Sequence, residues 1–215
     1  MITLAFDTAL GSCSVALGDG QTLLAARYEE REAGQAERLI PLMEETLAEA
    51  GLAARQIARI GVTIGPGSFT GTRIGLAAAR AMGVSLGIPV IGLTTLEALS
   101  DTAPADRDVM VAFDARRGQL YVQMFSLQMN GAREALSEPA TLDVEQAATL
   151  LHAHDRPITL LGSGAEALAP HGPAGACILM PARFPIAAAF LARIARAAPG
   201  PGMPRPLYLR PADTT

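Results

Sequence analysis

The chain has 215 residues, of which 50% are hydrophobic and 18% charged, so it can bury a core and is not disordered by composition. Its formal net charge is −4 at pH 7, which disfavours tight, direct binding of nucleic acid, because such binding normally requires a basic surface. All 17 basic residues are arginine, which excludes a Schiff-base lysine and the lysine of a phosphate-binding P-loop.

The first fifty residues predict a group of strands followed by a helix. Strands are expected at 2–8, 13–17 and 22–28, with an Asp19-Gly20 pair that is typical of a hairpin turn between the last two. Apolar residues at helical spacing then predict a helix over 35–50. Pro41 lies inside this pattern, so it either kinks the helix or marks its true start.

A strand, a glycine-rich loop and a second helix follow. The buried strand spans 57–64, the loop spans 65–71, and the helix spans 72–86 and ends near Gly87. A further strand is expected at 89–93, and Thr94 or Thr95 is expected to cap a short helix that runs through Leu99.

Pro104 and several charges mark a change of composition near residues 101–108, and we expect domains at 1–103 and 104–215. The second domain is expected to hold strands at 109–114, 119–127 and 158–161, helices at 144–152 and 186–198, and an extended proline-rich tail. Strands that begin as hairpins and continue through helical crossovers predict an α/β fold with a mixed sheet.

Candidate ligand-binding residues fall at the carboxyl ends of the predicted strands, where such sheets bind ligands. They are Asp7-Thr8, the 65–71 loop and Asp114. The loop either cradles an anion on the amides of the following helix or is a tight turn without a ligand. Asp7 either positions a metal-bound phosphate, faced by Asp114, or is an ordinary cap or turn residue.

The second predicted helix carries a ridge of small residues and is apolar on nearly every face. A single sheet does not easily cover such a helix, which favours an interface with another helix pair over packing on the chain's own sheet alone. The interface candidates are Leu39, Met43, Leu47, Ile74, Gly75, Ala78 and Met82. Arg73 lies unfavourably at the positive end of the helix dipole, which predicts a carboxylate or phosphate partner for it.

Cys13 and Cys177 lie in apolar runs and are expected to be buried residues of a reducing compartment. The three histidines have no cysteine or carboxylate cluster beside them, so no metal site is expected. No basic leader opens the chain, and the apolar run at 81–96 is too short for a membrane span. We therefore expect a cytoplasmic protein without a membrane partner.

Four motifs together resemble the TsaB family, also called YeaZ. They are Phe6-Asp7-Thr8, the run from Gly65 to Gly75, Asp114-Ala115-Arg116-Arg117, and the closing run from Pro206 to Arg210. The resemblance covers nearly the whole chain in order. It implies an actin/Hsp70/sugar-kinase-like, or RNase H-like, fold of two lobes with a reduced second lobe.

The resemblance also implies an accessory, dimerising subunit of the bacterial complex that forms threonylcarbamoyladenosine in tRNA. The implied partners are the catalytic subunit TsaD, as a heterodimer, and the ATPase TsaE, with a homodimer when the chain is alone and tRNA reached only through the complex. TsaD carries two metal-binding histidines, and the matching positions here are Thr95 and Leu99, which cannot hold iron or zinc. No catalytic residue and no metal ligand are therefore expected.

Arg116 and Arg117 stand where nucleotide-binding members of this fold have small glycines, so independent ATP binding is not expected. Any contact with ATP or ADP would be weak or dependent on a partner. The residues of such a degenerate nucleotide or anion site would be Asp7, Thr8, Gly65, Gly67, Ser68, Gly162 and Gly164. The alternatives are a stand-alone ATP-binding regulatory module, a glycoprotease-like hydrolase and a small-molecule kinase.

Overall fold

The computed structural model describes residues 1–173, 176–179 and 186–210, with only the backbone at 177–179. The chain divides into two compact units, Met1–Ala98 with Pro185–Tyr208 and Leu99–Phe184 with Leu209–Thr215. The first boundary lies close to the expected one. The helix α6 (Ile186–Arg196), however, belongs to the first unit and not to the second lobe, which corrects the expected division of the chain.

The first unit is built on a five-stranded sheet. Its order is β3 (Thr22–Glu30), β2 (Ser12–Asp19), β1 (Ile2–Asp7), β4 (Ile57–Thr63) and β5 (Val90–Leu93). The β1–β2 and β2–β3 pairs are antiparallel, whereas β1–β4 and β4–β5 are parallel. This confirms the mixed sheet. The parallel strands bring the carboxyl ends of β1 and β4 to the same edge.

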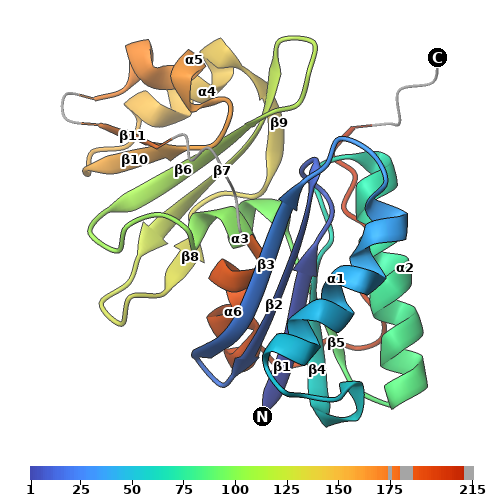
Figure 1. Cartoon of the computed structure of the whole chain (residues 1–215). Coiled ribbons are helices and arrows are strands. Elements are labelled where there is room, and N and C mark those ends of the chain that lie inside the picture. The colour runs from blue at the N-terminus through green and yellow to red at the C-terminus, as the bar shows by residue number, and fades with distance from the viewer. Residues whose placement is uncertain (174–175, 180–185, 211–215) are drawn as a thin grey trace. The chain divides into compact units, whose positions relative to one another are not determined.

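Helices cover both faces of this sheet (Figure 1). On one face, α1 (Gln35–Glu49) and α2 (Phe69–Leu86) pack against inward-facing residues such as Leu4 and Phe6. On the other, α6 packs so closely that a Cβ at Gly61 would lie 2.6 Å from Ile194 Cγ1. The chain returns with α6, far along the sequence from β5, to complete this core, which explains why the sequence boundary misplaced α6.

The ends of the helices follow from local capping. Pro41 lies inside α1, which begins at Gln35, so Pro41 does not mark its start. The helix α2 begins at Phe69, earlier than expected, because Ser68 Oγ accepts a hydrogen bond from Gly71 N at 3.2 Å. Gly71 is therefore part of the helix and not of the loop. Gly87, with φ of 65°, closes α2 as expected.

The short helix α3 (Thr95–Ser100) is capped by Thr94, which decides between the two candidate threonines. Thr94 Oγ1 accepts from Glu97 N at 3.0 Å, and Glu97 Oε2 accepts from Thr94 N at 2.8 Å. This reciprocal pair is a capping box.

The second unit holds its own mixed sheet with α4 (Val144–His152) and α5 (Ala165–Leu168) over a compact core. The strand order is β11 (Cys177–Leu179), β10 (Ile158–Leu161), β6 (Asp108–Asp114), β7 (Gln119–Leu127) and β8 (Arg133–Ala135), with β9 (Ala140–Asp143) also paired to β7. The β6–β7 hairpin was expected, whereas the three-residue strands and α5 were too short to be predicted. Short 3-10 helices span Ala54–Gln56 and Ala169–His171. In the described part of the chain, no helix is both long and apolar enough to cross a membrane.

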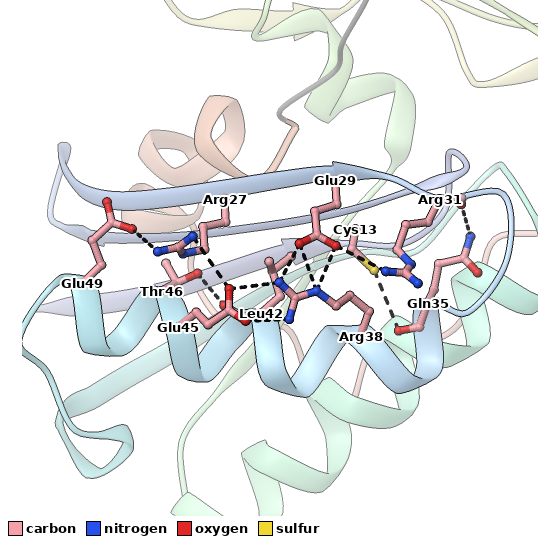
Figure 2. Close-up of polar contacts among 10 residues, drawn as sticks. All are labelled: Cys13, Arg27, Glu29, Arg31, Gln35, Arg38, Leu42, Glu45, Thr46 and Glu49. Atoms are coloured by element: carbon pink, nitrogen blue, oxygen red, sulfur yellow. Dashed lines mark hydrogen bonds and ion pairs between the residues drawn. The ribbon is translucent and has the colours of Figure 1, made fainter.

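An ion-pair network ties α1 to the edge strand β3 (Figure 2). The Arg38 guanidinium donates to Glu29 at 2.5–2.9 Å and to Glu45 at 2.6–2.9 Å. The hydrogen bonds from Arg38 lower the pKa of both carboxyls. Because these groups are partly exposed, the network positions α1 more than it stabilises the fold. The free thiol of Cys13 is buried beneath it, as expected, and burial raises its pKa to about 11.

Candidate functional site

The strand ends of the first unit bring Asp7 and Thr63 together, at the ends of β1 and β4. Asp7 is 0% exposed. Its Oδ1 accepts hydrogen bonds from Thr63 Oγ1 and, at 3.1 Å, from Ala9 N. Its Oδ2 is buried without a hydrogen-bond partner in the described part of the chain. Burial raises the pKa of Asp7 to about 6, although the Thr63 hydroxyl and the amides of Ala9 and Leu10 oppose the shift.

The loop that follows β4 is filled by the chain's own backbone. The carbonyl oxygen of Ala9 accepts a hydrogen bond from Ser68 N at 2.8 Å. A Cβ at Gly67 would lie 2.5 Å from the same oxygen, so only glycine fits there. Since Gly71 N donates to Ser68 Oγ, two of the amides at the start of α2 already have acceptors within the chain. This arrangement favours the tight turn over the anion cradle.

Thr8 closes the same contact from the other side. Its Oγ1 donates to the Gly71 carbonyl at 2.7 Å, and a Cβ at Gly71 would overlap the carbonyl oxygen of Thr8. Gly75 faces Thr8 as well, since its Cβ would lie 2.8 Å from Thr8 Oγ1. Thr8, Gly67 and Gly71 therefore lock the β1–β2 turn onto the start of α2. Gly65 has φ of 96° and packs against the Leu207 carbonyl of the tail.

The strand ends of the second unit bring the Gly162–Gly164 loop to β6. A Cβ at Gly162 would overlap the carbonyl oxygen of Ala112, and Gly164 N donates to that oxygen at 3.0 Å. Ser163 Oγ accepts from Asp114 N at 3.0 Å. Both glycines thus serve close packing of the chain on itself. Asp7 and Asp114 belong to different units, and their mutual approach stays a prediction.

The turn after Asp114 has an unusual backbone. Arg116, Arg117 and Gly118 all have left-handed φ values, of 63°, 56° and 71°. This conformation costs a residue other than glycine roughly 1–2 kcal/mol. Asp114 Oδ1 accepts from Arg116 N at 2.7 Å, and Arg210 Nη1 donates to the carbonyls of Ala115 and Arg116. The sequence shows that Arg116 and Arg117 have bulky side chains. Their backbone strain and the hydrogen bonds from Arg210 are visible only in the structure.

The interface candidates separate into two groups. Leu39, Met43, Leu47 and Gly75 are buried in the core of the first unit, so they face the chain's own sheet, which corrects their assignment to a partner surface. Their helical spacing reflects the inward face of each helix. The remaining candidates are half-buried and border the outer face of α2: Ile74, Ala78 and Met82.

The C-terminal tail covers one flank of α2, which the sequence did not predict. Arg80 Nη2 donates to the Pro204 carbonyl at 2.5 Å, and Leu207 N donates to the Ile64 carbonyl at 2.7 Å. Arg73 Nε donates to Tyr208 Oη at 2.9 Å, and its guanidinium lies 3.7 Å from the centroid of the Phe69 ring. Arg73 is thus paired with aromatic groups within the described residues, and the expected anionic partner stays a prediction.

His154 contacts a buried carboxylate, that of Asp108, and does not form part of a metal site among the described residues. His154 Nε2 and Arg156 Nη2 lie 3.1 and 2.7 Å from Asp108 Oδ2, while Asp108 Oδ1 accepts from Leu127 N at 2.8 Å. This cluster neutralises a buried carboxylate at the start of β6. Within the described residues, no group of three or more His, Cys, Asp or Glu side chains could hold a metal ion. The side chain of Cys177 lies outside the described residues.

Comparison with known proteins identifies the family. The model for TsaD, tRNA N6-adenosine threonylcarbamoyltransferase, matches residues 29–172. The chain is 31% identical over 163 residues to the tRNA threonylcarbamoyladenosine biosynthesis protein TsaB of Bacillus subtilis, covering 75% of this chain and 71% of that protein. The chain belongs to the TsaB (YeaZ) family. Across three curated relatives, the matched segment covers 71%, 64% and 42% of their own lengths.

Solved structures extend the TsaB likeness to nearly the whole chain. A Pseudomonas aeruginosa protein described as similar to the peptidase YeaZ superposes with a TM-score of 0.78 at 29% identity, over 97% of this chain and 99% of that one. A hexokinase of the ROK type from Thermus thermophilus superposes with a TM-score of 0.54 at 16% identity, over 90% and 99% of the two chains. The expected actin/Hsp70/sugar-kinase-like fold is confirmed.

The TsaB-type chain keeps Thr95 and Leu99 as packing residues. Both side chains are buried, and Thr95 N donates to the Gly65 carbonyl at 2.9 Å. The start of α3 is thereby joined to the glycine loop. Neither side chain provides the imidazole or thiolate that iron or zinc prefers.

Proposed function

We propose that this chain is a non-catalytic subunit of an assembly that forms threonylcarbamoyladenosine in tRNA. Its family membership supports the pathway, and one structural observation supports the non-catalytic role. The Ala9 carbonyl occupies the start of α2, where a phosphate-binding loop would present free amides. Asp7, beneath it, is fully buried and shared between Thr63 and the β1–β2 turn.

The proposed partner is a TsaD-type catalytic subunit, because a subunit without chemistry of its own must act through one that has it. The proposed contact surface is the outer face of α1 and α2. Ile40 is 45% exposed and Val84 74% exposed, and the small side chains of Ala77 and Ala81 are exposed between the helix ends. Small residues let another helix approach closely. Ile74, Ala78 and Met82 border this surface and gain burial when it is covered.

The same surface is proposed to join two copies when the catalytic subunit is absent. An exposed apolar helix face is rarely left uncovered in solution, and the two occupants would compete for it. The pair formed with the catalytic subunit is proposed to recruit the ATPase TsaE, and tRNA is reached within the complex. Any ATP or ADP contact of this chain would then depend on its partners.

Co-purification tests the proposal. This chain and the TsaD homologue of the same genome are co-expressed with a tag on one of them. The expected result is a stoichiometric complex that binds added TsaE and modifies unmodified tRNA. The chain alone should neither hydrolyse ATP nor bind it saturably. Turnover by the chain alone, or failure to pair with the catalytic subunit, would overturn the proposal.

A further inference from the structure

The turn between β6 and β7 carries arginine where its backbone favours glycine or asparagine. Three consecutive residues, Arg116, Arg117 and Gly118, have positive φ between 56° and 71°. Hairpin turns with this backbone are dominated by Asn-Gly, Asp-Gly and Gly-Gly pairs. Strain of this kind is retained at functional sites, where the side chain itself is needed.

Both arginine side chains are presented outward, since Arg116 and Arg117 are exposed residues at the tip of the hairpin. Two features fix the turn beneath them. Asp114 Oδ1 accepts from Arg116 N at 2.7 Å, and the Arg210 guanidinium donates to the carbonyls of Ala115 and Arg116. A third guanidinium therefore lies directly under the two at the tip.

This concentration of positive charge contrasts with the chain as a whole, which has a net charge of −4. The planar guanidinium matches the geometry of a phosphate group, which it binds through two parallel hydrogen bonds. A convex turn reaches a phosphodiester backbone without a pocket, and such contacts position a nucleic acid without reading its sequence.

We propose that the 115–118 turn, supported by Arg210, is a phosphate contact for the RNA substrate of the assembly. The inference rests on the proposed function for the identity of that RNA as a tRNA. An acidic chain with one local basic turn supplies an orienting contact, while most of the affinity comes from other subunits. The positive turn places the RNA backbone at the exposed tip of the second unit's β6–β7 hairpin.

The test uses variants that remove charge while suiting the backbone. Asparagine adopts left-handed φ more readily than arginine, so R116N/R117N should keep or raise thermal stability. The matched control is R55N/R205N, which removes the same charge from two other exposed arginines. R116N alone is the second variant, used if the double variant does not fold.

Isotopically labelled chain is titrated at low salt with an unmodified anticodon stem-loop RNA, and separately with ATP. RNA should shift the amide resonances of 116–118, and R116N/R117N should weaken its binding at least fivefold, with the control within twofold of wild type. Unchanged RNA binding by R116N/R117N, or equal shifts of these amides by ATP, would overturn the inference. Pairing with the catalytic subunit is measured separately. Its failure with RNA binding intact would overturn the proposed function alone.

Discussion

Two regions of this molecule each follow the carboxyl end of a strand, β4 in the first unit and β6 in the second. Glycines in the first region face the interior, whereas arginines in the second face solvent. In the first unit, Gly67 of the loop after β4 and Gly71 at the start of α2 face inward, onto the Ala9 and Thr8 carbonyls. The 115–118 turn of the second unit accepts backbone strain and presents two arginines outward. The comparison teaches that a glycine-rich loop is not by itself a ligand site. Whether such a loop can bind a ligand depends on whether the chain's own backbone already occupies it, as the Ala9 carbonyl does here.

Gly71→Ala should destabilise the inward-facing region and should have the largest effect of the substitutions considered. A Cβ at this position would overlap the Thr8 carbonyl oxygen, so the β1–β2 turn or the start of α2 must move. We expect a loss of about 3 kcal/mol in the free energy of unfolding, measured by chemical denaturation. Gly200→Ala is the control, since nothing lies within 4 Å of its Cβ. Equal stability of the two variants would show that the turn is not locked.

Asp7→Asn should stabilise the same region at neutral and higher pH, because it removes a buried charge. The folded pKa of Asp7, about 6, lies above the ordinary aspartate value of 3.8, so its contribution to stability is full below pH 4 and lost as the pH rises through 6. Asparagine keeps an oxygen acceptor for Thr63 and Ala9. We expect the variant to be more stable than wild type by about 2–3 kcal/mol at pH 8 and to lose this advantage near pH 4. Denaturation curves at both pH values measure this, and an unstable variant at pH 8 would contradict it.

Ala81→Glu should leave both regions intact and test the outer face of α2. A charge placed on this exposed apolar surface should weaken pairing with the catalytic subunit at least tenfold, about 1.4 kcal/mol, and should also reduce self-association. Light scattering and calorimetric titration measure the two effects. Ala54→Glu, at an exposed position in the 3-10 helix, is the matched control. If both variants pair like wild type, the contact surface lies elsewhere.

Ser68→Ala should have the smallest effect. The Ser68 hydroxyl accepts one hydrogen bond, from Gly71 N at 3.2 Å, as the cap of α2. Loss of such a cap costs about 1 kcal/mol. A thermal melt measures the cost, with Ser85→Ala, an exposed position near the end of the same helix, as the control. A loss several times larger would mean that Ser68 has a further role.

Most of the fold of the first unit could be predicted from the sequence, because its strands and helices are marked by patterns within short stretches of the chain. Short apolar runs and the Asp19-Gly20 turn predicted the strands, and Gly87 marked the helix end. What it missed depends on contacts between residues far apart in the chain. The packing of Ala9 on Gly67, of Ile194 on Gly61 and of Leu207 on Ile64 has no signature in any short window.

The candidate site was predicted in part for the same reason. The motifs at Asp7, Gly65 and Asp114 do fall at strand ends, but composition could not show that the Ala9 carbonyl fills the loop. Buried and outward-facing apolar residues share one helical period, so Leu39 and Met43 were assigned to a partner. The Arg116-Arg117-Gly118 run between two predicted strands was a usable signal for a charged turn. The sequence analysis treats these arginines only as bulky residues that obstruct nucleotide binding.

The most direct test of the central claim is the rate of tRNA modification in a reconstituted reaction containing the catalytic subunit, TsaE, ATP and unmodified tRNA. The account predicts that modification requires this chain, and that Ser68→Ala, once shown to assemble, supports a rate within twofold of wild type. If Ser68→Ala assembled normally but abolished modification, the 65–71 loop would take part in chemistry, and the non-catalytic account would be wrong.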